Sequence, residues 1–328
     1  MKELTYVRAT SADEAVATVS ADLHAQYLGG GTNLTDHLKL GIATPGVLVD
    51  VSRLPLDRVE ETDSGLRIGA AVRNSDLAAH PLVRTGFPAL SRALLAGASG
   101  QIRNQATTAG NLLQRTRCVY FQDASTPCNK REPGSGCSAL EGYGRYNAVL
   151  GTSEACVAVH PSDMAVAMAA LDAEVVALGT DGERRIPLED LHRLPGHHPE
   201  RDTNLAHGEL ITAVELPRSA AARTSTYEKA RDRASYAFAL VSVAAGLELD
   251  GDRVTDVRIA WGGAAHKPWR ARTAEDLLRD GPIDEDRVRH AVAEELRPAT
   301  TGPDSDYKVA MLTGITARAL VRLSEAAR

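Results

Sequence analysis

The sequence is poor in aromatic rings and has neither a long apolar run nor an excess of basic charge. Aromatic residues make up 4% of the 328 residues, and the formal net charge is -6 at pH 7. We therefore expect no nucleic-acid partner, which would need a basic surface and rings that stack on bases. No stretch reaches the about 18 consecutive apolar residues of a membrane span. The first residues also lack the apolar segment of a secretory signal, so we expect a cytoplasmic protein unless a folded partner carries it across a membrane.

Cysteine is scarce too, and its four copies lie close together. Cys118, Cys128, Cys137 and Cys156 fall in the stretch 115–156, which has five glycines, two prolines and few branched aliphatic residues. Such a stretch cannot order itself by burying apolar side chains. Without an export signal we expect the thiols to be reduced, and reduced thiols that gather outside an apolar core usually share a metal.

The spacing of these cysteines, C-x9-C-x8-C-x18-C, bears on which metal they bind. Zinc fingers usually contain a close cysteine pair, so the absence of one weakens a structural zinc site without excluding it. A 4Fe-4S cluster takes four thiolates from different directions, which long intervening loops supply. Five basic residues are placed to offset the negative charge of a cluster, although a solvated basic loop explains each of them equally well. They are Arg115, Arg117, Lys130, Arg131 and Arg145.

A glycine-rich segment, Gly29-Gly30-Gly31-Thr32-Asn33, lies between a predicted strand around Tyr27 and a predicted helix over 34–40. Glycine permits positive φ angles and close approach, so the backbone N–H groups of such a turn can converge on a phosphate. The helix that follows would add the positive end of its dipole. A plain turn is the commoner explanation, and the segment is not a GxGxxG fingerprint.

A second segment, Thr107-Thr108-Ala109-Gly110-Asn111-Leu112, again combines hydroxyls, a glycine and an amide. Two such segments would hold a pyrophosphate from both sides, with side-chain oxygens and amides adding to the backbone donors. Two unrelated turns are the alternative. Asp163, which follows Pro161 and Ser162, is either the capping aspartate of a helix or an acceptor for the hydroxyls of a cofactor.

The length and the order of the predicted elements indicate an α+β protein of two or three packed units. The first part is expected to hold helices capped by Ser11, Ser75 and Ser162, a helix over 89–95, and strands at 47–51, 66–68, 174–178, 184–186 and 210–216. Residues 220–223 are interpreted as a surface linker. The second part is expected to hold strands at 241–247 and 257–261, joined by a turn at 250–251, and then helices over 272–279, 284–296 and 305–326.

Four motifs gain meaning when they are taken together. They are Leu28-Gly29-Gly30-Gly31-Thr32-Asn33-Leu34, Thr108-Ala109-Gly110-Asn111-Leu112, His160-Pro161-Ser162-Asp163-Met164 and Tyr227-Glu228-Lys229-Ala230-Arg231. In this combination the chain resembles, over nearly its whole length, the FAD-binding subunit of the molybdenum hydroxylases, the xanthine dehydrogenase family. The resemblance implies a two-part FAD-binding domain of the PCMH type over 1–220, with an insert at 115–156. It also implies a smaller α/β C-terminal domain of the CO dehydrogenase flavoprotein type over 221–328.

Most members of that family lack an insert with cysteines. The insert here is similar to that of the periplasmic aldehyde oxidoreductase FAD subunit and, less closely, to that of the β subunit of 4-hydroxybenzoyl-CoA reductase. Both of those carry an additional 4Fe-4S cluster, so the resemblance implies that Cys118, Cys128, Cys137 and Cys156 bind one. In this group a partner subunit with a twin-arginine signal would also take the chain to the periplasm.

The resemblance further implies which residues bind FAD. The two glycine-containing segments would hold its pyrophosphate, and Asp163 its ribityl or ribose side. Ile211 would pack near the isoalloxazine ring, where Lys229 would stabilise the negative charge of the reduced ring. No catalytic residue is expected in this chain. The implied FAD-binding residues are Tyr27, Leu28, Gly29, Gly30, Gly31, Thr32, Asn33, Leu34, Thr108, Gly110, Asn111, Gln114, Asp163, Ile211 and Lys229.

The implied work is electron transfer. A large partner subunit would oxidise an aldehyde at a molybdenum cofactor, and a small partner subunit would carry electrons through 2Fe-2S clusters to the FAD of this chain. The FAD would then pass them to an external acceptor, a small molecule or a protein. The chain is thus expected to be the flavin subunit of a heterotrimeric molybdenum-dependent aldehyde oxidoreductase. A stand-alone FAD-dependent reductase and a zinc-stapled binding module are the two alternatives.

Overall fold

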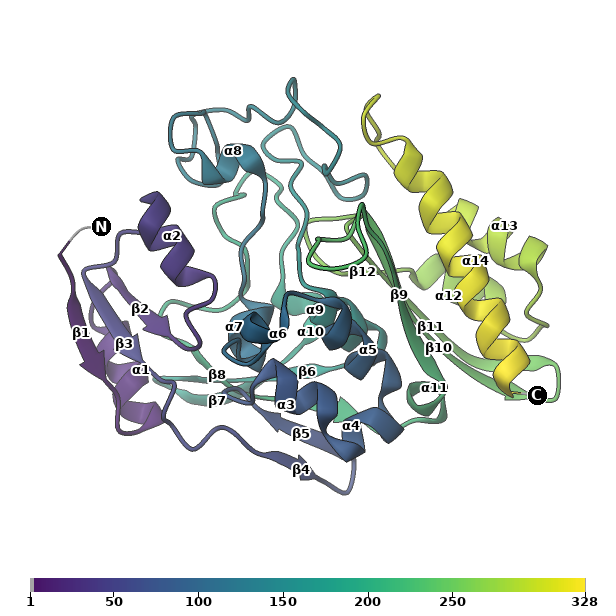
Figure 1. The fold of residues 1–328 in the computed structure, drawn as a ribbon, viewed down its shortest axis with the longest axis horizontal. Coiled ribbons are helices and arrows are strands. Elements are labelled where there is room, and N and C mark those ends of the chain that lie inside the picture. Colours follow the sequence, from purple (N-terminus) through teal and green to yellow (C-terminus); the bar gives the residue numbers. More distant parts are fainter. Residues whose placement is uncertain (1–2, 328) are drawn as a thin grey trace.

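The chain forms three β-sheets with helices packed between and around them, in a computed structural model that describes residues 3–327 (Figure 1). The first sheet is parallel, with the strand order β1-β3-β2. Ser11 begins its first crossover helix, because the Ser11 hydroxyl accepts the N–H of Glu14 and so satisfies a free donor of the first turn. Val16 and Val19 of that helix pack on Val49 in a small core. The elements are β1 (Thr5–Arg8), α1 (Ala12–Ser20), β2 (Ala25–Leu28), α2 (Leu34–Leu40) and β3 (Val47–Asp50).

The second sheet is antiparallel, with the strand order β4-β5-β8-β6-β7. Ile68, Val175 and Val214 of this sheet share the largest core with Leu90 and Met168, which lie on the helices packed against it. The strands are β4 (Val59–Glu61), β5 (Gly65–Gly69), β6 (Glu174–Gly179), β7 (Gly182–Pro187) and β8 (Leu210–Pro217). The helices are α3 (Asn74–Ala79), α4 (Pro81–Gly86), α5 (Pro88–Ala96), α6 (Gly100–Arg103), α7 (Thr108–Leu112), α8 (Val119–Gln122), α9 (Asp163–Ala170) and α10 (Leu188–Leu191).

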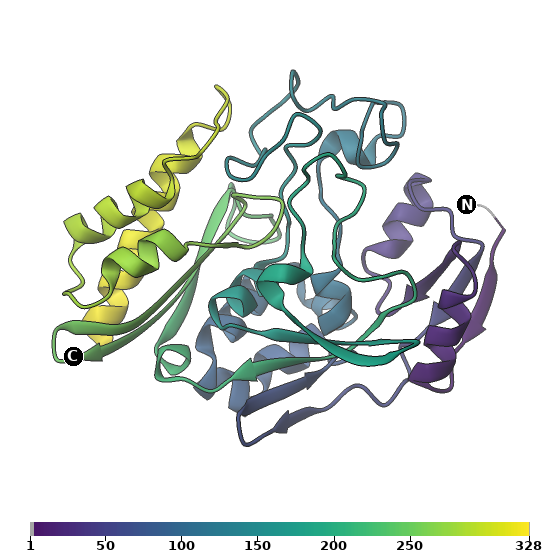
Figure 2. The same ribbon diagram turned by 180° about the vertical axis from the view of Figure 1, so that it is seen from behind.

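The third sheet is also antiparallel, with the strand order β12-β11-β10-β9. The long helix α14 lies across its outer face, as Figure 2 shows from behind. Trp261 of the sheet is fully buried and donates its indole N–H to the hydroxyl of Thr316 on that helix over 2.9 Å. The elements are α11 (Ala220–Arg223), β9 (Ser225–Ala230), β10 (Val241–Asp250), β11 (Arg253–Gly262), β12 (Trp269–Arg270), α12 (Arg272–Leu278), α13 (Glu285–Glu295) and α14 (Tyr307–Ala327).

Helix α9 joins the second sheet to the third. All eight of its residues are buried, because one side packs on the helices α5, α7 and α10, which share the core of the second sheet, and the other on β10 and β11. A helix that is apolar almost all round is typical of a core position between two layers. Tyr227, Ala244 and Ala260 of the third sheet therefore belong to the same core as the second sheet.

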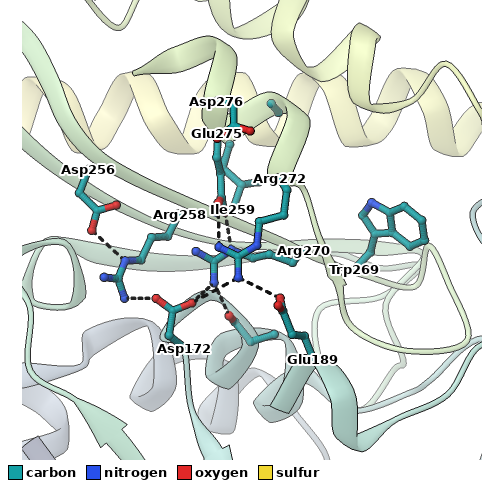
Figure 3. A network of polar contacts seen from close by, with 12 residues as sticks. Asp172, Glu189, Asp256, Arg258, Ile259, Trp269, Arg270, Arg272, Glu275 and Asp276 are labelled. Carbon is teal, nitrogen blue, oxygen red and sulfur yellow. Dashed lines mark hydrogen bonds and ion pairs between the residues drawn. The ribbon is translucent and has the colours of Figure 1, made fainter. Parts of the chain in front are cut away.

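A network of buried charges strengthens this junction (Figure 3). The carboxylate of Asp172, just after α9, accepts Arg270 Nη1 over 2.5 Å and lies 2.7 Å from Arg258 Nη1. Arg270 also pairs through Nε with Glu275, whose side chain is fully buried and accepts the N–H of Ile259 over 2.7 Å. Buried charges are tolerated when they are paired and hydrogen-bonded. The network thus fixes the third sheet against α9.

Most of the predicted elements are confirmed. The strand, glycine turn, helix and strand between 25 and 50 are present, as are the hairpin of β6 and β7, the turn at Gly251 and the three C-terminal helices. Two interpretations are wrong. Ser75 lies inside α3, which begins after Arg73 without a side-chain cap, and residues 220–223 form the helix α11. Among residues 3–327, no helix combines the length and apolarity needed to cross a membrane.

The supposed linker became a helix for two local reasons. Ser219 accepts the N–H of Ala222 over 3.0 Å and so caps the first turn. Ala221 and Ala222 are buried, because Gly246 of β10 leaves room for the backbone of Ala221. A Cβ at Gly246 would lie 2.6 Å from the carbonyl oxygen of Ala221. The run of alanines is therefore a packing surface.

Candidate functional site

The two glycine-containing segments pack directly against each other. A Cβ at Gly30 would lie only 2.0 Å from the carbonyl oxygen of Gln105, and a Cβ at Gly29 would lie 3.2 Å from Oγ1 of Thr107. Glycine is therefore required at position 30 by the close approach of two backbones. Gly31 has a φ of +74°, which turns the chain from β2 toward α2. From the sequence alone, the two segments could have been unrelated turns, but in the structure they are in contact.

Side chains hold this pair of segments to the rest of the site. Thr107 caps α7 by accepting the N–H of Gly110. Asn111 donates to Asn74 over 2.7 Å and accepts the hydroxyl of Ser162 over 2.6 Å. Because Ser162 also caps α9, Asn111 ties the start of α9 to the end of the second segment.

Two adjoining cavities open on these segments. The first, here called the glycine cavity, has a volume of about 680 Å³ and is lined by both segments, by Tyr27 and by Ile211. The second, here called the lysine cavity, has a volume of about 620 Å³ and reaches from the same segments to Asp163 and Lys229. Thr32, Asn33 and Gly110 line both. Small molecules and cofactors usually bind in concave sites of this size, which are largely formed before the ligand binds.

The structure brings nearly all of the predicted FAD-binding residues to these two cavities. Leu28 and Thr108 are the exceptions. Thr108 is fully buried and donates its hydroxyl to the carbonyl of Val72 over 3.1 Å, so it supports the backbone behind the site. Its neighbour Thr107 lines the glycine cavity instead. The predicted FAD-binding residues that line one or both cavities are Tyr27, Gly29, Gly30, Gly31, Thr32, Asn33, Leu34, Gly110, Asn111, Gln114, Asp163, Ile211 and Lys229.

Asp163 and Lys229 form an ion pair at the base of the lysine cavity. Lys229 Nζ lies 2.7 Å from Asp163 Oδ2, and less than a tenth of either side chain is exposed. Tyr227 donates its phenol to the other carboxylate oxygen, Oδ1, over 2.5 Å. Burial and the neighbouring carboxylate raise the pKa of Tyr227 well above its usual value, so the phenol keeps its proton. Asp163 is the first residue of α9 and not its cap, which is Ser162.

The sequence analysis missed Tyr227 as a site residue, although a signal was available. Residues two apart on a strand point to the same face, and Tyr227 stands two before Lys229. Ser242 was also missed. It lies opposite Lys229 in the register of β9 with β10 and lines the lysine cavity.

The four cysteines are free thiols, and all four line one further, small cavity. Cys128 and Cys137 face each other across an antiparallel bridge, which Asn129 stabilises by accepting the N–H groups of two glycines. Burial raises the pKa of Cys118, while the N–H groups of Phe121 and Tyr120 oppose that rise. Burial likewise raises the pKa of Cys156 to about 11, against the charge of Lys130, which lowers it.

These thiols do not form a compact set of metal ligands in the structure. Within residues 3–327, no group of three or more histidine, cysteine or acidic side chains has an arrangement that could hold a metal ion. The donor chemistry, four thiols around one cavity, nevertheless suits a soft metal or an iron-sulfur cluster. The 4Fe-4S cluster expected from the sequence therefore stays a prediction.

The five basic residues of the cysteine stretch all have hydrogen-bond or ion-pair partners within the protein. Arg115 and Lys130 both pair with Asp202, and the Lys130 side chain is almost fully buried. The remaining three bond elsewhere: Arg131 donates to backbone carbonyls of the stretch, Arg145 pairs with Asp232, and Arg117 donates to a carbonyl and lies over the ring of Phe238. Lys130 is thus the cation among the five whose charge acts on Cys156.

Two histidines that the sequence did not connect pack against each other beside the lysine cavity, which His160 lines. The rings of His160 and His192 lie 4.2 Å apart, and His160 Nε2 and His192 Nδ1 are buried with no hydrogen-bond partner among the described residues. Burial and the neighbouring His192 hold the pKa of His160 well below its usual value, and burial lowers that of His192 to about 4. These rings are therefore neutral at pH 7.

Comparison with known families agrees with this site. Residues 2–219 match the family described as the FAD binding domain in molybdopterin dehydrogenase. The chain belongs to this family of FAD-binding flavoproteins. Residues 225–323 match the CO dehydrogenase flavoprotein C-terminal domain. The α+β fold expected from the sequence and the family resemblance are both confirmed, and the chain is the FAD-binding, medium-type subunit of oxidoreductases of the xanthine dehydrogenase family.

Individual relatives cover most of the chain. It is 57% identical over 283 residues to the aldehyde oxidoreductase FAD-binding subunit PaoB of Escherichia coli K12, which covers 86% of this chain and 87% of that protein. It is 27% identical over 307 residues to the glyceraldehyde dehydrogenase medium chain of Sulfolobus acidocaldarius, covering 93% of this chain and 91% of the other.

Solved structures of this family share the fold. Carbon monoxide dehydrogenase from Hydrogenophaga pseudoflava superimposes with a TM-score of 0.77 at 24% identity, over 99% of this chain and 98% of the other. Quinoline 2-oxidoreductase from Pseudomonas putida 86 superimposes with a TM-score of 0.76 at 23% identity, over 100% of this chain and 99% of the other. At such identities the likeness concerns the fold and not the substrate.

Proposed function

We propose that this chain is the electron-transfer flavin subunit of a heterotrimeric molybdenum-dependent aldehyde oxidoreductase. The main support for this proposal is the pair of adjoining cavities. The two glycine-containing segments, which contact each other, line one end, and the Asp163–Lys229 ion pair lines the other. The 57% identity to an aldehyde oxidoreductase FAD-binding subunit supports the substrate class of the complex.

The residues around the cavities suit the parts of FAD. The backbone N–H groups of Gly29 to Thr32 and the start of α7 would hold the pyrophosphate, and Asp163 would accept a ribityl hydroxyl. Ile211 would pack near the ring, and the Lys229 ammonium would lie where the ring gains negative charge on reduction. Bound FAD supplies the chemistry, since it takes up electrons singly and releases them singly or in pairs. The chain's own residues bind and orient the cofactor and set the field around it.

The assembly belongs to the same proposal. We assign residues 1–220 to the FAD-binding domain and 221–328 to the C-terminal domain. A large molybdopterin-binding subunit and a small subunit with 2Fe-2S clusters would deliver electrons to the FAD, and an external small-molecule or protein acceptor would receive them. Three relatives are named as medium chains or subunits, which supports a chain of this size working beside a larger and a smaller one.

A 4Fe-4S cluster on Cys118, Cys128, Cys137 and Cys156 is the finer part of the proposal. Its support is the chemistry of four free thiols around one cavity and the presence of buried Lys130 nearby, a cation that favours a negatively charged cluster. Iron and acid-labile sulfide of about four each per chain are expected after anaerobic purification. Cys128→Ser should lose most of the iron, whereas zinc in place of iron would contradict this part.

The flavin proposal is tested on the full chain, purified alone and with its partner subunits. We expect about one FAD per chain, with an absorption spectrum that bleaches on dithionite, and reduction of the flavin by an aldehyde when the partners are present. A chain that refuses FAD altogether would overturn the proposal. Reduction by a nicotinamide nucleotide in the absence of partners would favour the stand-alone reductase, and zinc without flavin would favour the binding module.

The compartment is proposed to be the cytoplasm, since all four cysteines are free thiols and such thiols persist in a reducing compartment. Fractionation of cells that express the complete complex tests this. Recovery of the chain with a periplasmic marker would show export with a partner instead.

A further inference from the structure

Tyr227 occupies an unusual place for a phenol. It lies on β9 in the core shared by α9 and the third sheet, with 5% of its surface exposed, yet its oxygen meets the carboxylate of Asp163 at the edge of the lysine cavity. A buried phenol needs a hydrogen-bond partner, and here that partner is a group of the candidate FAD site. The residue therefore links the core of the protein to the site.

The strand register explains how Tyr227 and Lys229 reach the same carboxylate. The two residues stand two apart on β9, pair with Ala244 and Ser242 of β10, and so point to one face of the sheet. That face covers the first turn of α9, where Asp163 lies. One oxygen of the carboxylate accepts the phenol over 2.5 Å and the other accepts the ammonium over 2.7 Å. Both oxygens of the carboxylate therefore accept a hydrogen bond from β9.

The carboxylate keeps capacity for a further donor. An ionised carboxylate offers about four lone-pair positions, and the two protein donors use about half of them. Asp163 lines the lysine cavity, and a Cβ at Gly97 would lie 3.1 Å from its Oδ2. The absence of a side chain at Gly97 thus leaves room for this carboxylate.

The floor of the cavity beside this group is polar as well. The hydroxyl of Ser242 is buried and faces the phenol of Tyr227, but no partner with ordinary hydrogen-bond geometry lies beside it among the residues that the structure describes. It lies close to Gly262, where a Cβ would come within 2.4 Å of the oxygen. A buried hydroxyl with spare hydrogen-bonding capacity beside an ion pair is a feature that a bound polar ligand would satisfy.

From this geometry we infer that Tyr227 is a positioning residue for the flavin cofactor. It fixes the orientation of Asp163, so that one carboxylate holds Lys229 beside the ring and also presents a free lone pair to the cofactor. The inference rests on the proposed FAD function and adds to it a residue that does not itself touch FAD. Removing the phenol leaves the carboxylate free to rotate and concentrates its negative charge, since a donor that disperses the charge is lost.

Tyr227→Phe is the variant that tests this, because it removes the hydroxyl and keeps the ring in the core. We expect FAD to bind about tenfold more weakly, the effect of losing one hydrogen bond to a charged group. At equilibrium with a reference dye, the ratio of reduced to oxidised flavin should fall by about threefold to tenfold, because the less screened carboxylate disfavours negative charge on the ring. Tyr307→Phe is the matched control. It removes a phenol that donates to the carbonyl of Arg145 over 2.8 Å, outside the lysine cavity, and should leave both measurements unchanged.

A double-mutant cycle shows whether Tyr227 acts through Asp163. In a chain that carries Asp163→Ala, the further change Tyr227→Phe should alter FAD affinity by less than about twofold. An undiminished tenfold loss in that background would overturn the inference, as would wild-type affinity and potential in Tyr227→Phe itself. A wild-type chain that binds no FAD would instead refute the proposed function.

A second variant covers the case in which Tyr227→Phe fails to fold. Asp163→Asn keeps the shape of the side chain, and the phenol of Tyr227 should orient its oxygen, which turns the amide nitrogen toward Lys229. Two donors then face each other, so Asp163→Asn should weaken FAD binding as far as Asp163→Ala does. A clearly milder effect of Asp163→Asn would mean that the side chain turns freely, and the inference would be wrong.

Discussion

Arg115 donates from Nε to Oδ2 of Asp202 over 2.6 Å, although 87 positions separate the two residues in the chain. Asp202 also accepts from the ammonium of Lys130, which donates to the carbonyl of Pro199 over 2.7 Å as well. A stretch with few apolar residues of its own is thus held to the body of the protein by one carboxylate with two cations. One part of the attachment of the cysteine stretch is thus electrostatic, while Val149 and Leu150 at its far end pack in the core of the third sheet.

Asp202→Asn should therefore destabilise the protein strongly. The change leaves Lys130 buried without its counter-charge, and breaking one side of a buried pair costs about 3 kcal/mol, the lower end of the usual range, because Asp202 is partly exposed. Urea unfolding of the wild type and the variant measures the difference. Glu61→Gln is the control, since its pair with Arg218 is exposed on both sides and should contribute less than about 1 kcal/mol.

Acidification should weaken the fold through the buried histidines His160 and His192. The pKa of His192 is about 4 in the folded protein and about 6.5 in an unfolded chain, so the unfolded state takes up more protons as pH falls below about 6.5. Stability is therefore lost between about pH 6.5 and about pH 4, by about 2 kcal/mol at pH 5 for this residue alone. Thermal unfolding at pH 7 and pH 5 measures the loss. His192→Gln should show a smaller difference between the two pH values, and an unchanged difference would contradict this account.

Gly30→Ala should separate the two glycine-containing segments. Its Cβ would collide with the carbonyl oxygen of Gln105, a backbone atom that cannot move without shifting the second segment. We expect a destabilisation of about 1 to 3 kcal/mol, together with loss of most FAD binding. Differential scanning fluorimetry with and without FAD measures both. Gly86→Ala, at a helix end where a Cβ meets nothing within 4 Å, should change neither measurement.

Arg270→Met should loosen the third sheet from α9. The change removes the nearer cation of fully buried Glu275, which keeps only Arg272 Nη1 at 3.5 Å, and removes one of the donors to Asp172, at an expected cost of about 3 kcal/mol. Chemical denaturation followed by the fluorescence of the buried Trp261 reports this loss. Arg253→Gln removes an exposed ion pair with Asp280 and should cost less than about 1 kcal/mol. Equal losses in both variants would mean that burial of the network is not the cause.

Local patterns predicted much of the fold. Ser11, Ser162 and Gly41 marked helix ends correctly, because caps depend on residues a few positions apart. Ser75 misled the prediction, since the helix there begins without a side-chain cap and owes its position to the packing of Leu77 and Ala78.

Only part of the site could be predicted from the sequence. Lys229 was predicted from a motif. Thr108 was predicted as a site residue, but in the structure its neighbour Thr107 lines the glycine cavity, and the sequence does not show which of the two hydroxyls faces the cavity. The contact of His160 with His192 joins segments 32 positions apart through the tertiary fold, and no local spacing encodes it. Asp172, with a φ of 51°, takes the left-handed position that ends α9, where the N–H of Ala173 bonds to the carbonyl of Met168 over 3.1 Å, and no glycine marks this helix end in the sequence.

The lysine cavity has walls from both sides of the α9 junction, with Asp163 on one and Lys229 on the other. A molecule that fills it touches both layers at once, so its binding energy also adds to their adhesion. By thermodynamic reciprocity, whatever tightens the contact between the layers raises the affinity for that molecule by the same factor. The affinity for the cofactor and the stability of the contact between the two layers are therefore thermodynamically linked.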